Sequence, residues 1–232
     1  MRAEDLIRFI EEVGRLKMIP RTGWRFHGLP QSESVAEHSF RTAVLAMALG
    51  DALRRRGVRL DMEKLLRMAL LHELPEARIG DIPFPAFQFL PEEVKEEAER
   101  RAMEAMVEGL GEIGEEYLKL WEEFEERGSL EAKVARAADK LELMIQVYQY
   151  EKVGLRNLDR FWVNPWNRRD FDAHPLIGEL MEALERMRRE IFELERRRGE
   201  EGEGEGGDNE RRGDEKGADA DSQPDTREEQ GV

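Results

Sequence analysis

The chain has 232 residues, enough for one sizeable domain, and 38% of them are charged, as expected of a globular protein with a charge-rich surface. Its net charge of −15 argues against a broad nucleic-acid-binding face, and no stretch approaches the roughly eighteen apolar residues of a membrane span. The absence of cysteine excludes disulfides, thiolate catalysis and zinc–thiolate sites, so we expect a cytoplasmic protein.

Hydrophobic residues recur at helical spacing through most of the chain. Asp61 and Ser129 are placed to cap helices, and Pro175 suits the first position of the last one. Pro75 should end or kink a helix directly after His72. We therefore expect one all-α domain, without strands, of six or seven helices. They are predicted over roughly residues 4–17, 34–57, 61–74, 91–109, 113–127, 129–154 and 175–198.

The C-terminal segment, residues 199–232, has a different composition from the rest. It contains thirteen acidic and four basic residues, and only three apolar ones. Such a segment cannot bury enough surface to offset the entropy of ordering, so it predicts a disordered acidic tail behind a domain of residues 1–198. Tails of this kind often only solvate the protein, but one that recruits a basic partner would make the chain an adaptor.

Four polar residues lie within or at the end of apolar helices: His38, His72, Glu73 and Asp139. A buried carboxylate is costly unless it is paired or bound to metal. Two imidazoles and two carboxylates would satisfy one another around one divalent cation, and mixed ligands suit Mn²⁺, Fe²⁺, Co²⁺ or Zn²⁺, with Mg²⁺ also compatible. Singly, each has an ordinary explanation; Asp139, for example, is placed to pair with a neighbouring Arg or Lys.

The order His38, then His72–Glu73, then Asp139 resembles the H…HD…D pattern of HD-domain metal-dependent phosphohydrolases. The segments LKMIPRTGW, ESVAEHS, GDIP and LKLWEEFEERGSLEAKVARAADKLE resemble the HD-domain 5′-deoxynucleotidase family, over about residues 4–190. This resemblance implies a compact HD-type domain that removes the phosphate of deoxyribonucleoside 5′-monophosphates with one divalent metal ion, commonly as a homodimer.

One position departs from that family: residue 73 is Glu where the family has Asp. The extra methylene moves the carboxylate by more than an ångström, whereas metal–ligand distances tolerate only about 0.2 Å. Either the backbone compensates, or the metal affinity and preference change, or catalysis is impaired. The last case would leave a nucleotide- or metal-binding regulator of the same fold.

The resemblance also implies roles for four further residues. Glu76 would orient or deprotonate the attacking water, if the helix continues through Pro75 so that Glu76 shares a face with His72. Asp81 would face the sugar and exclude a 2′-hydroxyl, or is only a turn residue after a glycine. Arg21 would bind phosphate, or is a solvated charge. The remaining residue, Trp24, would offer a flat surface to the base or sugar, or packs under a long loop.

Three other functions stay open at this point. They are the regulator, the adaptor that acts through its acidic tail, and a phosphodiesterase for cyclic or polyphosphorylated nucleotides. The phosphodiesterase ranks last because larger binuclear sites usually need more histidines than the four in this chain.

Overall fold

The structure, a computed structural model, describes residues 1–29 and 32–206. Over these residues the chain is helical, and its only extended pairing is a single bridge between Pro20 and Ser34. The prediction of an all-α protein is therefore confirmed. No helix in the described ranges combines the length and apolar character needed to cross a membrane.

Nine α-helices follow one another in the described part of the chain. Seven of them have ten residues or more, in line with the six or seven predicted, and the short helices α4 and α8 were not predicted. The α-helices are α1 (Ala3–Val13), α2 (Val35–Arg55), α3 (Met62–Leu71), α4 (Glu76–Ile79), α5 (Glu92–Val107), α6 (Glu112–Glu126), α7 (Leu130–Lys152), α8 (Asp159–Val163) and α9 (Pro175–Gly206). Short 3₁₀ helices, among them η1 (Gly14–Met18), η2 (Thr22–His27), η3 (Phe84–Gln88) and η4 (Glu108–Leu110), lie in the connections.

The predicted helix starts are confirmed by their capping interactions. The carboxylate of Asp61 accepts a hydrogen bond from the backbone of Lys64, and the Ser129 hydroxyl accepts one from Ala132. Ser34 begins α2 in the same way, and Glu37 completes a capping box. These bonds satisfy backbone donors that the first helical turn leaves free.

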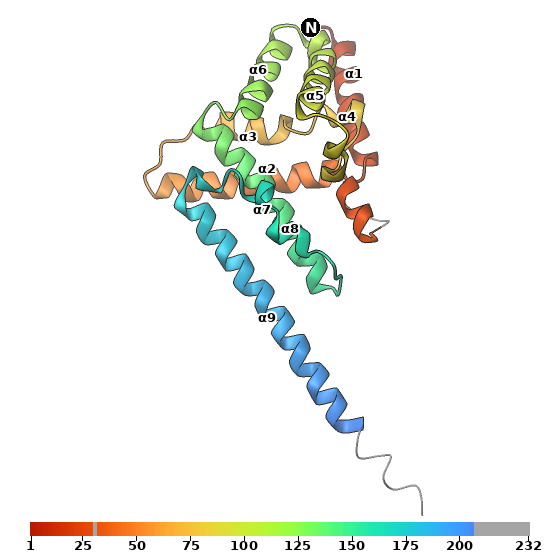
Figure 1. The fold of residues 1–232 in the computed structure, drawn as a ribbon. Helices are drawn as coiled ribbons and strands as arrows, with labels where there is room; N and C mark the ends of the chain where they lie inside the picture. Colours follow the sequence, from red (N-terminus) through yellow and green to blue (C-terminus); the bar gives the residue numbers. More distant parts are fainter. Residues whose placement is uncertain (30–31, 207–232) are drawn as a thin grey trace, which may run out of the picture. The chain divides into compact units, whose positions relative to one another are not determined.

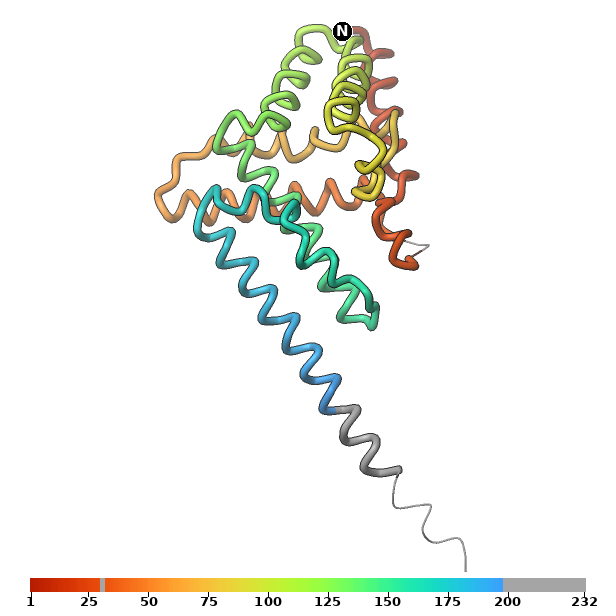
Figure 2. Tube along the Cα trace, in the orientation of Figure 1, coloured from red at the N-terminus to blue at the C-terminus, as the bar shows by residue number. Residues whose placement is uncertain are grey.

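Helices α2, α3 and α7 pack against one another and form the centre of the domain, as can be followed in Figures 1 and 2. Their contact surfaces carry small and aliphatic side chains, including the fully buried Ala46, Leu65 and Ala138. Small residues let helix axes approach closely, so a polar side chain on one of these faces must find its partner on a neighbouring helix.

A second apolar cluster joins α1, α5 and α6 to the end of α3. Phe9, Met103 and Trp121 are buried in it, together with Leu71 and Leu74. The Trp121 indole donates a hydrogen bond to the carbonyl oxygen of His72 (3.3 Å). This cluster therefore holds the C-terminal end of α3 in place from one side, while α2 and α7 hold the helix from the other.

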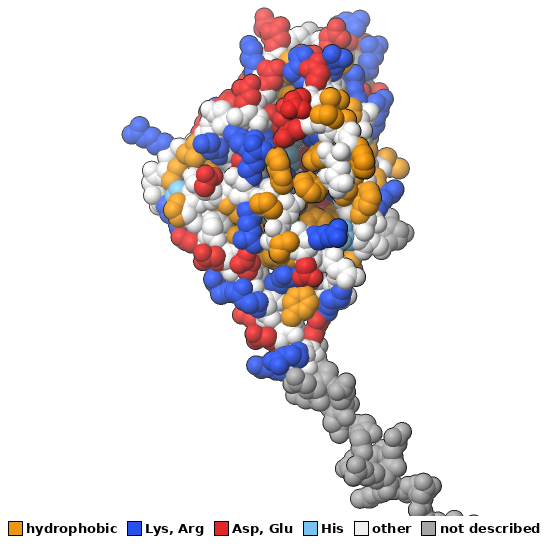
Figure 3. Space-filling model, viewed as in Figure 1, with side chains coloured by type: hydrophobic (Ala, Val, Ile, Leu, Met, Phe, Trp, Pro, Cys, Tyr) orange, Lys and Arg blue, Asp and Glu red, His pale blue; other side chains and the backbone are white. Residues whose placement is uncertain are grey.

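The charged residues lie mainly outside these two cores. On the face drawn in Figure 3, acidic and basic side chains are interspersed, with apolar side chains between them. The exposed side of α5 shows the pattern in detail, since Arg100 pairs with both Glu97 and Glu104. No single sign of charge dominates the face drawn in Figure 3.

The last helix, α9, extends beyond its predicted end. It continues to Gly206 instead of ending near Arg198, and Glu and Arg, which favour helices, are frequent along it. The compact unit that carries the site consists of residues 1–188. Most of the predicted acidic tail, residues 207–232, lies outside the described residues.

Candidate metal centre

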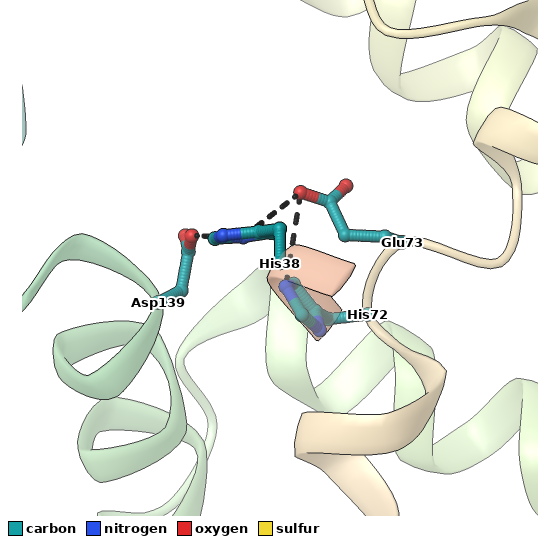
Figure 4. Close-up of side chains that lie close together, drawn as sticks. All are labelled: His38, His72, Glu73 and Asp139. Carbon is teal, nitrogen blue, oxygen red and sulfur yellow. Dashed lines mark hydrogen bonds and ion pairs between the residues drawn. The ribbon is translucent and has the colours of Figure 1, made fainter. Parts of the chain in front are cut away.

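The three central helices bring the four candidate ligands together. His38 lies on α2 and Asp139 on α7, whereas His72 caps the end of α3 and Glu73 follows it (Figure 4). One ligand atom of each residue lies within 4.8 Å of those of the other three. Two nitrogen and two oxygen donors at this separation form a group that can hold a divalent cation.

The Nε2 atoms of the two imidazoles face the carboxylates of the cluster. His38 Nε2 is 3.1 Å from Asp139 Oδ1 and 3.6 Å from Glu73 Oε1. His72 Nε2 is 3.7 Å from the same Glu73 oxygen. His38 is completely buried and His72 and Asp139 are each 6% exposed, so little water reaches these groups.

His72 provides the test of whether the residues fit a metal. Its Nδ1 atom faces the carbonyl oxygen of Ala69 at 2.9 Å and must donate to it, since a carbonyl only accepts. The ring therefore presents an unprotonated Nε2 atom, which is buried and has no hydrogen-bond partner. Such an orphaned acceptor is costly, and a cation between the two imidazoles and two carboxylates would satisfy it. The donor set fits a divalent metal ion.

The electrostatics favour ligand forms for three of the four groups. Burial lowers the pKa of His72, which keeps it neutral. Burial opposes ionisation of the two carboxyl groups, but Arg21 and the imidazoles hold the pKa of Glu73 well below its usual range, and Lys140 and His38 do the same for Asp139. His38 differs: although burial lowers its pKa, Asp139 and Glu142 raise it to about 9. A metal ion must displace that proton.

Glu73 reaches the cluster despite its extra methylene. Its Oε1 atom approaches both imidazoles, and it also accepts a hydrogen bond from Arg21 Nη1 at 2.8 Å. Its side chain leaves from the turn after α3 and not from a helix, and the three outcomes that the sequence left open stay predictions.

Arg21 lies beside the candidate ligands and is not a solvated charge. Its side chain is only 13% exposed, and Nη1 lies 3.7 Å from Asp81 Oδ1 as well as close to Glu73. Burial alone would lower the pKa of this guanidinium, but the carboxylates of Asp81 and Glu73 outweigh burial and raise the pKa above its usual value. The site thus holds a fixed cation next to the position of the candidate metal.

Asp81 anchors the loop that carries Arg21. Its Oδ2 atom accepts a hydrogen bond from the backbone of Thr22 at 2.5 Å. Gly80, just before it, adopts a φ of +78°, a conformation that L-residues with side chains rarely reach. Asp81 is therefore more than a turn residue, and its observed contacts are with the loop.

Trp24 is buried, with 1% of its surface exposed. Its ring packs against Tyr150 (centroids 5.0 Å apart) and Phe161 (4.8 Å), and its indole N–H donates to Glu33 Oε1. The ring has no free face for a base. This placement favours the packing role over the ligand-binding role, and the loop above it gains a rigid support.

Replacing Trp24 with alanine is expected to lower the free energy of unfolding by about 3–5 kcal/mol, because a large buried side chain is removed. The conservative change Trp24→Phe should keep most of the stability, because an aromatic ring still fills the site. Urea denaturation measures both variants, and Trp166→Ala is the control because Trp166 is 44% exposed. A Trp24→Ala variant of unchanged stability would contradict the packing role.

Glu76 lies close to the candidate metal by a route that differs from the prediction. The helix does not continue through Pro75: α3 ends at Leu71, a turn follows, and α4 begins at Glu76. The predicted end of the helix near His72 is therefore confirmed, and the condition of one continuous helical face is not met, since proline lacks the N–H that a continuous helix would need. Glu76 is nevertheless only 5% exposed, and burial together with the nearby carboxylates of Glu73 and Asp81 raises the pKa of its carboxyl group.

Asp139 also forms one of the two ion pairs that would explain its position without a metal. Lys140 Nζ lies 2.9 Å from Asp139 Oδ2. Arg136, the other candidate partner, pairs instead with Glu125 and Asp170. The ion pair occupies one carboxylate oxygen of Asp139, while the other, Oδ1, faces His38.

Two functional candidates were missed by the sequence reasoning: Glu33 and Glu142. Their carboxylates and the His38 ring form a second close group. Glu142 Oε2 is 2.5 Å from His38 Nδ1. The available signal was the same as for Asp139, a carboxylate in the apolar centre of the helix over 129–154, three residues further on.

Comparison with known proteins agrees with this geometry. A family model described as HD domain matches residues 13–172. The chain is similar to the 5′-deoxynucleotidase HDDC2 of Homo sapiens, with 35% identity over 80% of this chain and 87% of the relative. It is also similar to the 5′-deoxynucleotidase hdd1 of Schizosaccharomyces pombe, with 32% identity over 78% and 89% of the two chains.

Solved structures give the same result. A conserved hypothetical protein from Pyrococcus furiosus matches with 39% identity and a TM-score of 0.67, over 79% of this chain and 99% of that one. A predicted metal-dependent phosphohydrolase from Magnetospirillum magnetotacticum matches with 25% identity and a TM-score of 0.65, over 82% and 94%. With its helical fold, its clustered ligands and these relatives, the chain belongs to the HD domain family.

Proposed function

We propose that the protein is a metal-dependent phosphatase that removes the 5′-phosphate from deoxyribonucleoside 5′-monophosphates. The observation that carries this proposal is the orphaned Nε2 atom of His72 in a buried group of two imidazoles and two carboxylates. Relatives that span most of the chain and are named 5′-deoxynucleotidase support the choice of substrate.

In this proposal His38, His72, Glu73 and Asp139 hold one divalent cation. Manganese, cobalt, iron, zinc and magnesium are the candidates that suit the mixed donor set. When bound, such a cation lowers the pKa of a water molecule and shields the charge of a phosphate monoester. The uncatalysed hydrolysis of such esters is extremely slow, so both effects are needed.

The other residues act on the phosphate and on the water. The guanidinium of Arg21 binds the phosphate, for which its planar set of donors is suited. Glu76 serves as the general base: it is buried beside Glu73, and its Oε2 atom has no hydrogen-bond partner. A carboxylate with a free oxygen is able to accept a proton from an attacking water.

Asp81 and Trp24 take supporting roles. Asp81 holds the Arg21 loop through the backbone of Thr22, and its role toward the sugar stays a prediction that ribonucleotides test. Trp24 supports the same loop from the core, and it is not assigned to the base.

The test is direct. The purified protein is stripped of metal, reloaded with each candidate cation, and assayed for phosphate release from deoxyribo- and ribonucleoside 5′-monophosphates. We expect turnover of the deoxyribonucleotides that depends on the added metal. Lack of turnover with every cation and substrate would overturn the proposal, and equal rates on ribonucleotides would remove the role of Asp81 toward the sugar.

The same assay separates the alternatives. A regulator with impaired catalysis would show thermal stabilisation by nucleotide without phosphate release, and a Glu73→Asp variant would then bind metal more tightly. An adaptor would lose its partner when residues 199–232 are deleted, whereas the enzyme keeps its turnover. Analytical ultracentrifugation tests the homodimer, which stays a prediction.

A further inference from the structure

The candidate metal ligand His38 contacts a further buried carboxylate, that of Glu142. Glu142 lies on α7, one helical turn after Asp139, and is 1% exposed. Its Oε2 atom is 2.5 Å from Nδ1 of His38, the ring nitrogen that points away from the cluster. The buried ring of His38 is thus held between Glu142 on one side and Asp139 on the other.

This contact determines which nitrogen of His38 carries a proton. A carboxylate only accepts hydrogen bonds, so Nδ1 must keep its proton to bond with Glu142. In the neutral ring Nε2 then carries the free electron pair, and this atom faces Asp139 and Glu73. His72 achieves the same result with a backbone carbonyl, that of Ala69. Partners of this kind fix the orientation and tautomer of histidine ligands.

Glu142 is itself supported from the protein surface. The Nε atom of Arg41, on α2, lies 3.2 Å from Glu142 Oε1, and its Nη1 atom donates to Gln146 Oε1. The guanidinium charge offsets part of the cost of burying a carboxylate. Because the Arg41 side chain is one-third exposed, it can be replaced with less disturbance of the core than Glu142.

We infer that Glu142 is a positioning residue for the metal centre: it fixes His38 with Nε2 toward the cation, and Arg41 holds Glu142 in place. The substitution Glu142→Gln keeps the shape of the side chain. Arg41 Nε, a donor, faces the position of Oε1 and should orient the amide oxygen toward itself, so that the amide nitrogen faces Nδ1 and donates to it. The proton of the ring then moves to Nε2, where it blocks the metal. This role rests on the metal site of the proposed function but not on its substrate.

The test measures metal affinity and not activity. Metal-free wild type and variants are titrated with Mn²⁺ and Co²⁺ in competition with a chelator. We expect Glu142→Gln to raise the dissociation constant by about 10–100-fold, the usual effect of losing such a partner. Arg41→Met should raise it in the same direction by about two- to five-fold, because its ion pair is partly exposed. The Arg41 variant also serves if Glu142→Gln fails to fold.

Glu151→Gln is the matched control. Glu151 is equally buried on the same helix, but it accepts from Trp162 and Arg188 and does not contact the cluster. Its variant should lose stability and keep the wild-type metal affinity. Because the chain has only four histidines, ¹⁵N spectra of the Zn²⁺-loaded protein provide a second readout: His38 should be protonated at Nδ1 in the wild type, with this signal lost in Glu142→Gln.

The outcomes separate the two levels of the proposal. A wild type that binds no metal would overturn both the metal centre and the role of Glu142. A wild type that binds metal, with unchanged affinity in Glu142→Gln and Arg41→Met, would overturn the role of Glu142 alone.

Discussion

Asp139→Asn is expected to abolish metal binding and to lower kcat/KM for deoxynucleotide hydrolysis by at least about 10³-fold, or ~4 kcal/mol of transition-state stabilisation. The change preserves the size of the side chain but removes the negative charge that faces His38 at 3.1 Å. A neutral amide oxygen is a weaker ligand for a divalent cation, and it no longer compensates the charge of that cation in a buried site.

Metal binding is measured by the thermal shift that the cation produces. A ligand at 100 times its dissociation constant stabilises a protein by about 2.7 kcal/mol, so the wild type should melt at a higher temperature with metal and Asp139→Asn should not. Asp170→Asn is the control, since Asp170 is also buried but pairs with Arg127 and Arg136 away from the ligands. An Asp139→Asn variant with a wild-type shift would remove Asp139 from the metal site.

Asp139 was identifiable from the sequence as a candidate metal ligand because apolar residues surround it. The segment ARAADKLELMI is apolar at its centre, and an acidic residue there must have a partner. The same argument applies to Glu142, which lies between Leu141 and Leu143, but the local sequence does not indicate its partner. Its partner, His38, is 104 residues away in sequence, and only the packing of α2 on α7 brings the two together.

The loop residues were less predictable than the helices. Caps such as Asp61 and Ser129 act within one helical turn, so local sequence was sufficient to predict them. Trp24 lies in a loop without periodicity, and its burial depends on Tyr150 and Phe161, more than a hundred residues later. No local pattern distinguishes a tryptophan that packs under a loop from one that is exposed to a ligand.

The turn after α3 shows both the strength and the limit of the local rules. Pro75 correctly indicated that the helix ends near His72. It did not indicate where Glu76 would point, because this depends on the geometry of the turn over residues 72–75 and on the new helix that follows. The turn places the Glu76 carboxyl group near that of Glu73. Glu76 therefore lies beside the candidate ligands even though no continuous helix connects it to His72.

Glu76→Gln is expected to lower kcat by about 10²–10⁴-fold while the bound metal remains, because the variant loses a general base and not a ligand. Glutamine fills the same space, and the four candidate ligands are unchanged. Metal content, measured by elemental analysis of the purified variant, therefore separates the two roles. Glu76→Asp keeps a carboxylate and should recover part of the lost rate.

The pH dependence provides the decisive measurement. Burial, with the nearby carboxylates of Glu73 and Asp81, raises the pKa of Glu76 well above its usual value. A general base acts only when deprotonated, so the rate of the wild type should fall as the pH drops through that pKa, with an acidic limb above pH 4.5, the ordinary value for Glu. With the metal kept saturating at every pH, so that proton competition at the ligands does not contribute, Glu76→Gln should lack this limb. A variant that retains it, or that loses its metal, would show that Glu76 is not the base.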